Sequence, residues 1–327
     1  MEARPEPLLF VVGAPRSGTT LLRAMLNRHS RIGLCDETFF FYWVANRQRV
    51  FGDLADPARR ARAVDRFLET RRVIRLGLDL AELRAALLRE ATSYPRFFAA
   101  LLRFCARAAG KTIAGEKTPQ HALEARTLLD WYPEARLLHL IRDPRDVVAS
   151  LRRMPWGAGS RLGDACTWRD CVAGAEACAA DPRFLRLRYE DLIEAPEQEL
   201  RRICAALGIA FESVMLEGSG RKTDRWWFDR AQGAIEKGRV ERWRSELTAD
   251  DIAVVEAVAG EALGRHGYVP AAPPATPAQM ARARREARMA GMRRRIRHLP
   301  ATFWRLFRPD LLAREERAVD GPADPVA

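Results

Sequence analysis

Residues 13–20, GAPRSGTT, combine the residue types and the spacing that bind an anion. They follow an apolar run at 8–12, which predicts a buried strand, and precede a run of helix formers at 21–26. A strand, a glycine-bounded turn and a helix direct backbone N–H groups and the positive end of the helix dipole at one point. The segment therefore predicts a cradle for a phosphate or a similar group, with an ordinary strand–helix turn as the simpler alternative. The residues expected to contact the anion are Arg16, Ser17, Gly18, Thr19 and Thr20.

The loop differs from the one that binds nucleoside triphosphates. That loop reads G-x-x-x-x-G-K-[ST], and its lysine reaches the terminal phosphates. Here Gly13 and Gly18 have the right spacing, but Thr19 stands in the lysine position and the cation has moved inside the loop, to Arg16. No obvious Mg²⁺-binding aspartate ends a later apolar strand. A P-loop kinase or nucleotidase is therefore disfavoured, although it stays the alternative enzyme class.

Four segments in order resemble the sulfotransferases that use 3′-phosphoadenosine 5′-phosphosulfate (PAPS). They are PRSGTT at 15–20 with Asp36-Glu37-Thr38 after the next helix, IRDPRDVVAS at 141–150, LRYEDL at 187–192 and KGRVERWR at 237–244. The resemblance spans about residues 8–268. It implies PAPS as the sulfuryl donor, PAP as the product and a hydroxyl or amine as the acceptor.

The resemblance also implies which residues bind the nucleotide. Arg142 and Ser150 would hold its 3′-phosphate, because the family places an Arg and a Ser eight residues apart there. The late loop would close over the nucleotide with Lys237, Gly238 and Arg239. Tyr189 would pack near the base or the ribose, or else belong to the core.

Sulfuryl transfer needs charge stabilisation at the transferring group and the leaving phosphate, and a base for the acceptor proton. The resemblance assigns Arg16 to the leaving phosphate and Lys117, at the end of a predicted strand, to the sulfuryl group. It makes Glu37 the base, and His121 is the rival base. The alternative for Lys117 is a solvated side chain at a strand end. The alternative for Glu37 is an acid favoured by the dipole at a helix start, and for Asp36 it is the cap of that helix.

Alternating elements predict the fold class. Strands are expected at 8–12, 112–116, 136–141 and 183–188, and helices fill most of the chain between them. This alternation predicts an α/β fold with three layers, a mostly parallel sheet flanked by helices, similar to the P-loop NTPase fold. Ligands of such sheets bind at the carboxyl ends of the strands.

The predicted domain organisation has a catalytic part and a tail. Residues 1–268 form the sulfotransferase domain, and a helical insertion at 40–109 would wall the acceptor pocket. A Pro/Ala linker at 269–278 leads to a basic amphipathic helical extension at 279–313, and 314–327 are expected to be disordered. Such a helix binds an anionic membrane surface or an acidic protein, or it packs back on the catalytic domain.

Composition limits the remaining choices. The net charge is +12, yet no nucleic-acid-binding signature accompanies it, so no nucleic-acid partner is expected. The six cysteines have neither Cys-x-x-Cys nor zinc-like spacing, which predicts reduced thiols and no metal. No apolar run is long enough to cross a bilayer. We expect a cytoplasmic, bacterial enzyme, either fully soluble or peripheral at the inner face of the membrane.

The acceptor is not predicted by the sequence. Aromatic runs at 39–43 and 226–228 are typical of a hydrophobic or sugar pocket, and more often of a core. A sugar, a lipid, a phenol, a peptide tyrosine and a small natural product all stay open. A non-catalytic nucleotide-binding adaptor that acts through its basic tail is the alternative outside enzymology.

Overall fold

The computed structural model describes residues 6–217, 238 and 240–297. The chain divides into two compact units. The first comprises 1–142 and 170–240, and the second comprises 143–169 and 241–327. Each unit is described by itself below.

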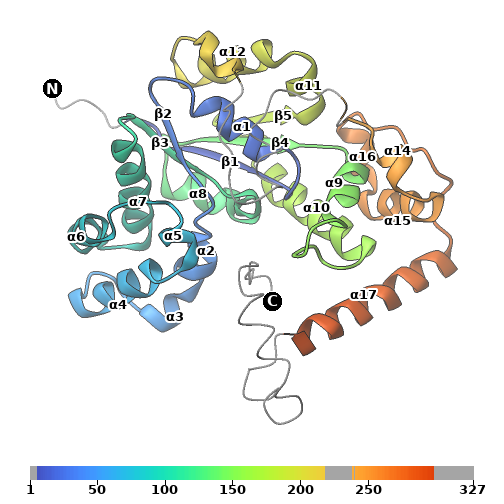
Figure 1. Cartoon of the computed structure of the whole chain (residues 1–327), viewed down its shortest axis with the longest axis horizontal. Helices are drawn as coiled ribbons and strands as arrows, with labels where there is room; N and C mark the ends of the chain where they lie inside the picture. The colour runs from blue at the N-terminus through green and yellow to red at the C-terminus, as the bar shows by residue number, and fades with distance from the viewer. Residues whose placement is uncertain (1–5, 218–237, 239, 298–327) are drawn as a thin grey trace. The chain divides into compact units, whose positions relative to one another are not determined.

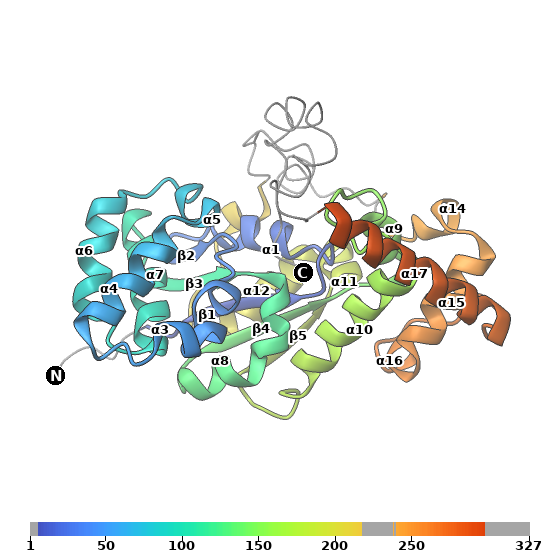
Figure 2. The same cartoon turned by 90° about the horizontal axis from the view of Figure 1, so that it is seen from below.

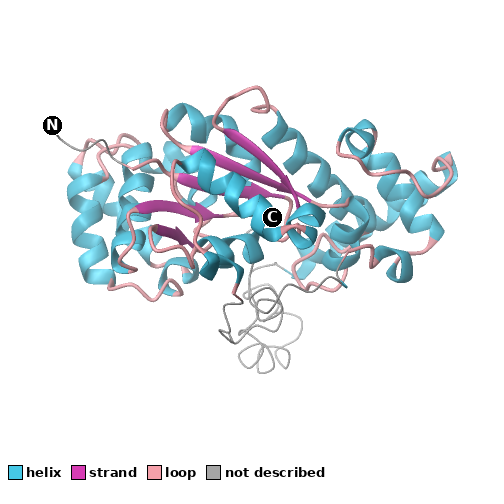
Figure 3. Cartoon of the chain, turned by 90° about the horizontal axis from the view of Figure 1, so that it is seen from above, coloured by secondary structure: helices cyan, strands magenta, loops and turns pink. Residues whose placement is uncertain are grey.

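A parallel sheet forms the centre of the first unit (Figure 3). Within the described residues it has five strands in the order β2-β3-β1-β4-β5. The strands are β1 (Leu9–Gly13), β2 (Ile32–Cys35), β3 (Ile113–Lys117), β4 (Arg136–Ile141) and β5 (Phe184–Arg188). All four pairings are parallel, so the carboxyl ends of the strands meet at one edge. The predicted fold class is confirmed.

Both faces of the sheet are covered, as the apolar composition of its strands predicts. Leu9 and Val11 point to one face, where they join a buried cluster with side chains of α1, α11 and α12. Phe10 points to the other face, because side chains alternate along a strand. Its ring stacks on Phe98 of α7 and on Tyr132, with ring centroids 5.9 and 5.7 Å apart.

The helices of the first unit connect these strands (Figure 1). They are α1 (Thr19–Leu26), α2 (Phe40–Trp43), α3 (Gln48–Phe51), α4 (Pro57–Leu68), α5 (Arg71–Ile74), α6 (Leu80–Glu90), α7 (Tyr94–Ala108), α8 (Ala125–Trp131), α11 (Tyr189–Glu194) and α12 (Pro196–Leu207). Short 3₁₀ turns add η1 (Ala45–Arg47), η2 (Pro119–Glu124) and η3 (Ser213–Leu216). Helix α10 (Arg161–Glu176) begins in the second unit and ends in the first.

The predicted helical insertion contains α2 to α7, which Figure 2 shows beside β2 and β3. Its helices begin where the sequence supplies acceptors for their first N–H groups: Asp56, Asp79 and Ser93 cap α4, α6 and α7. In the aromatic run at its start, residues 39–41 are buried, whereas Tyr42 and Trp43 are partly exposed. Phe40 is fully buried and stacks on Phe98, with centroids 4.5 Å apart.

Strand β2 corrects the predicted strand list. Its four residues, Ile32–Cys35, are all buried, but the run is too short and too uniformly apolar to show a strand period. The insertion therefore connects the second and third strands, β2 and β3, and does not follow the first strand directly. The correction matters because β2 leads directly into Asp36 and Glu37.

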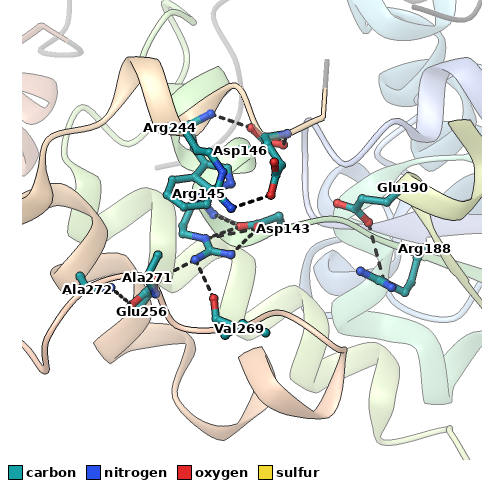
Figure 4. A network of polar contacts seen from close by, with 12 residues as sticks. Asp143, Arg145, Asp146, Arg188, Glu190, Arg244, Glu256, Val269, Ala271 and Ala272 are labelled. Atoms are coloured by element: carbon teal, nitrogen blue, oxygen red, sulfur yellow. Dashed lines mark hydrogen bonds and ion pairs between the residues drawn. The ribbon is translucent and has the colours of Figure 1, made fainter. Parts of the chain in front are cut away.

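The second unit contains α9 (Pro144–Leu151), α14 (Trp243–Glu246), α15 (Ala249–Ala259), α16 (Glu261–Arg265) and α17 (Pro277–Arg297). A buried arginine organises it (Figure 4). Arg145 donates to Asp143, to Glu256 at 2.7 Å and to the carbonyl oxygen of Val269 at 3.0 Å, and its guanidinium lies 4.0 Å from the ring centre of Trp243.

Helix α17 begins at Pro277, within the predicted linker. Its first half packs within the second unit: Ala283 is fully buried, Arg282 pairs with Asp250, and Glu286 lies 3.4 Å from Arg161. Further along, Met289 and Met292 are 51% and 60% exposed. The part of the predicted amphipathic extension beyond residue 297 and the predicted disorder of 314–327 lie outside the described residues. In the described part of the chain, no helix is both long and apolar enough to span a bilayer.

Candidate active site

The anion loop joins β1 to α1 and depends on two glycines. A Cβ on Gly13 would lie 2.3 Å from the carbonyl oxygen of Leu140 in the neighbouring strand. A Cβ on Gly18 would lie 2.3 Å from the ring of Tyr189, and Gly18 has a φ of 95°. Both positions therefore exclude a side chain, and Gly18 also needs the left-handed region that glycine enters without strain.

Three features of the loop are typical of anion-binding turns. Arg16 has a φ of 72°, a costly conformation for a residue with a Cβ, of the kind found at ligand-binding turns. No side chain of the described residues caps α1, so its first N–H groups are available to a ligand. The Ser17 hydroxyl is buried and has no hydrogen-bond partner among the described residues. These features fit the predicted phosphate-bearing donor.

Arg142 and Tyr189, two of the predicted nucleotide ligands, adjoin the loop. Arg142 follows the last residue of β4, and its Nη1 donates to the carbonyl oxygen of Arg16 at 3.2 Å. Its guanidinium lies 4.3 Å from the ring centre of Tyr189, the first residue of α11. Because the same ring contacts Gly18, the structure brings Arg142, Tyr189 and the loop together. The residues on either side of Tyr189, Arg188 and Glu190, form an ion pair with each other at 3.9 Å (Figure 4).

The other predicted nucleotide ligands stay predictions. Ser150 is buried near the end of α9, in the second unit. Gly238 is exposed. Lys237 and Arg239 lie outside the described residues, as do the aromatic residues 226–228.

Lys117 and Glu37 meet at the carboxyl edge of the sheet. β2 pairs with β3 so that Cys35 is opposite Glu116, and the next residues, Asp36 and Lys117, follow side by side. The Lys117 ammonium donates to Oε1 of Glu37 at 2.6 Å and lies 3.2 Å from Oδ1 of Asp36. Lys117 is completely buried, so the alternative of a solvated strand-end lysine is wrong.

Two arginines complete this cluster, and neither was predicted. Arg72 of α5, in the helical insertion, donates to Oε2 of Glu37 at 3.1 Å, with its guanidinium 4.4 Å from the ring centre of Phe39. Arg23 of α1 lies 3.5 Å from Asp36. Nothing local in the sequence marks Arg72, because its contact spans 35 residues.

Asp36 serves the cluster rather than capping a helix. The cap position of α2 is Phe39, so the helix-cap alternative for Asp36 is wrong. Burial would raise the pKa of the Asp36 carboxyl, but the charges of Lys117 and Arg23 outweigh burial and hold the pKa well below its usual range. Asp36 is therefore a fixed anion beside Lys117.

His121 lies in a different environment from Lys117. Glu116 and Lys117 are consecutive strand residues and point to opposite faces. His121 lies on the side of Glu116. Its Nδ1 is 3.0 Å from Oε2 of Glu116, and its ring packs edge to face against Phe41. Burial would raise the pKa of the Glu116 carboxyl, but His121 and the hydroxyls of Thr118 and Thr38 lower it. The structure thus brings Glu37, and not His121, to Lys117.

Comparisons with known proteins show which family the chain belongs to. A model of the sulfotransferase family matches residues 7–213. The chain belongs to the sulfotransferase family. It is 29% identical over 305 residues to the nodulation protein NoeE of Sinorhizobium fredii, covering 82% of this chain and 67% of the relative. It is 25% identical to protein-tyrosine sulfotransferase A of Caenorhabditis elegans, covering 83% and 70%.

A solved structure supports the same assignment. The sulfotransferase domain of the Synechococcus PCC 7002 olefin synthase is 25% identical, with a TM-score of 0.51, and covers 79% of this chain and 96% of that domain. The predicted enzyme class, a PAPS-dependent sulfotransferase, is confirmed by the family membership. Among the described residues of this sulfotransferase, no group of three or more His, Cys, Asp or Glu side chains is arranged to hold a metal ion.

Proposed function

We propose that this sulfotransferase transfers the sulfuryl group of PAPS to a hydroxyl group that Glu37 deprotonates. The acceptor oxygen forms a bond to sulfur, the bond from sulfur to the 5′-phosphate oxygen breaks, and PAP leaves with the electron pair. The acceptor proton passes to the Glu37 carboxylate. General-base catalysis of this kind typically supplies about 10²–10⁴-fold in rate.

The observation that carries this proposal is the contact between Lys117 and Glu37. It places a buried cation and a carboxylate 2.6 Å apart at the carboxyl edge of the sheet, where ligands of parallel α/β sheets bind. An acceptor hydroxyl at this point would meet a base, and the sulfuryl oxygens would meet the ammonium. Such preorganised charge is usually the largest single contribution to catalysis.

Arg72 gives Glu37 its orientation. Lys117 contacts one oxygen of the carboxylate and Arg72 the other, so the carboxylate cannot rotate without losing an ion pair. Each carboxylate oxygen has two lone pairs, so Glu37 can still accept the proton of the acceptor hydroxyl while it contacts Lys117 and Arg72. The Glu37 side chain is 17% exposed, which leaves it accessible to an acceptor.

The donor would bind in the anion loop through Arg16, Ser17 and the N–H groups at the start of α1. Arg142, held against Arg16 and Tyr189, would add a charge for the 3′-phosphate. The sequence motif that contains Arg142 also predicts Ser150 as a ligand of this phosphate. A cation of this kind contributes through charge-assisted hydrogen bonds, which are about twice as strong as neutral ones.

The function is tested in two steps. Thermal shift with PAP, against ATP with Mg²⁺, separates a sulfotransferase from a kinase, because a ligand stabilises the fold that binds it. Labelled PAPS is then offered with sugar, lipid, phenol and tyrosine-peptide acceptors, and products are identified by mass spectrometry. A shift with ATP and Mg²⁺ but none with PAP would overturn the donor assignment.

For the tail, we propose attachment to an anionic membrane surface. Exposed arginines, among them Arg284, Arg285 and Arg288, lie in the middle of α17, and the exposed methionines Met289 and Met292 follow them. Basic side chains beside exposed apolar ones are the combination that binds the interface of an anionic bilayer. An acidic protein is the competing partner.

A further inference from the structure

Two cysteines stand in contact beside the candidate active site. The Sγ atoms of Cys35 and Cys105 are 2.7 Å apart, well inside van der Waals contact and a short movement from the S–S bond length of about 2.05 Å. Cys35 is the last residue of β2, and Cys105 lies in the last turns of α7. Both are free thiols.

We propose that Cys35 and Cys105 are a redox-active pair that forms an intramolecular disulfide when the protein meets a hydroperoxide. This modification does not depend on the sulfuryl-transfer mechanism, and its test reads the covalent bond directly.

The two thiols have different accessibility, which assigns their order of reaction. Cys105 is partly exposed, whereas Cys35 is 5% exposed. The hydrogen bond with Cys105 and burial raise the pKa of the Cys35 thiol well above its usual value. A buried thiol of this kind reacts poorly with oxidants in solution. Cys105 is therefore the point of attack, and Cys35 is the resolving thiol.

The chemistry balances with the peroxide as the sole oxidant. The sulfur of Cys105 attacks one peroxide oxygen, the O–O bond breaks, and Cys105 becomes a sulfenic acid while water or an alcohol leaves. The sulfur of Cys35 then displaces the sulfenic hydroxyl, the S–S bond forms, and the thiol proton leaves with the hydroxyl as water. Two thiols are oxidised and one peroxide is reduced.

The position of the pair gives the bond a structural effect. Cys35 precedes the helical insertion, whose first helix begins at Phe40. Cys105 lies near the end of the insertion, whose last helix ends at Ala108. The bond would close a loop across 70 positions and join the two ends of the insertion. Asp36 and Glu37 directly follow Cys35, so the bond is anchored at the peptide that carries the candidate base.

The test uses the full-length protein, treated with hydrogen peroxide in moderate excess and then alkylated in denaturant. Peptide mapping should recover a Cys35–Cys105 linked peptide that dithiothreitol removes, and the melting temperature should rise on oxidation, because closing a long loop restricts the unfolded chain. Cys105→Ser should lose both effects. Cys166→Ser, which removes another partly buried thiol, should keep both.

Two outcomes would overturn the proposal. One is recovery of Cys105 as sulfinic acid with Cys35 fully alkylated, which would show that the buried thiol does not resolve the sulfenic acid. The other is an equal rise in melting temperature in wild type and Cys105→Ser, which would place the effect of the peroxide elsewhere.

Discussion

The Lys117 ammonium lies 2.6 Å from a Glu37 carboxylate oxygen although the two residues are 80 positions apart in the chain. The parallel pairing of β2 with β3 makes this contact, since both strands end at the same edge: Lys117 is the last residue of β3, and Glu37 follows β2 by two residues. The helical insertion between the strands supplies Arg72 to the same carboxylate. One segment thus connects the two strands and positions the base between them.

Replacing Glu37 by Gln tests the base. The amide keeps the shape of the side chain but cannot accept the acceptor proton, so kcat should fall about 10²–10⁴-fold. Calorimetry should find PAP affinity little changed, because the anion loop is intact. Glu90→Gln, in the same insertion, is the matched control. An active Glu37→Gln together with an inactive His121→Ala would transfer the role to His121.

Replacing Arg72 by Ala tests orientation of that base. Glu37 loses the contact to Oε2, and a misplaced catalytic group can cost about 10²-fold. We expect a lower kcat with an unchanged KM for PAPS, and partial recovery in Arg72→Lys or on adding methylguanidine. Arg75→Ala, an exposed arginine one position beyond α5, should behave as wild type. A fall in melting temperature without recovery by Lys or methylguanidine would indicate a merely structural role.

The sequence predicts the part of the site that local patterns encode. A predicted strand that ends in polar residues can be recognised from the sequence alone. The anion loop, the strand-end Lys117 and Arg142 all stand at such positions. β2 was missed because Ile32–Cys35 is four buried residues without alternation. Arg72 and Arg23 could not be found, because their partners are set by packing between distant elements. Likewise, nothing local in the sequence shows that Asp146 accepts the N–H groups of Glu241 and Trp243, about 95 positions further along the chain.

Adding one methyl group at Gly18 should abolish donor binding. In Gly18→Ala the new Cβ meets the Tyr189 ring at 2.3 Å, and the φ of 95° becomes strained at a cost of about 1–3 kcal/mol. Either change displaces the loop or Arg142. PAP should then give no thermal shift. Gly264→Ala is the control, since its Cβ would meet nothing within 4 Å. A normal PAP shift in Gly18→Ala would show that the loop tolerates the displacement.

Asp164, in the first turn of α10, should make stability depend on pH. Its carboxyl is buried, with Oδ1 bonded to the N–H of Ala158 at 2.8 Å and Oδ2 lacking a hydrogen-bond partner among the described residues. Burial raises its pKa from 3.8 to about 6, against weaker lowering by the Ala158 N–H and Arg152.

The sign of the effect follows from proton linkage. Between pH 4 and 6 the folded state binds the proton more than the unfolded state does, so stability falls as pH rises through this window. Asp164→Asn removes the titration. The stability of the variant relative to wild type should therefore increase from pH 4 to pH 8, by up to about 3 kcal/mol. Urea unfolding of both proteins at pH 4 and pH 8 measures this difference in the free energy of unfolding. The same difference at both pH values would contradict the prediction.

Reversing charge on α17 tests the proposed membrane surface. The triple variant Arg284→Glu, Arg285→Glu and Arg288→Glu should lose co-sedimentation with vesicles that contain anionic phosphatidylserine, at about 1 kcal/mol for each basic residue. Its turnover with PAPS should not change. Wild-type binding should weaken at high salt, because exposed charges are screened.

The control for this experiment tests whether vesicle binding depends on the surface of α17 or on the net charge of the protein. Arg62→Glu, Arg66→Glu and Arg89→Glu change the net charge equally, but on exposed positions of α4 and α6. If this variant loses vesicle binding to the same degree, net charge and not α17 governs attachment. If the melting temperature falls in the α17 variant but not in the control, the three arginines stabilise the folded protein, as Arg282 does through its ion pair with Asp250. Because Ala283 anchors the first half of the helix while Met289 and Met292 are exposed, we expect loss of binding without loss of stability.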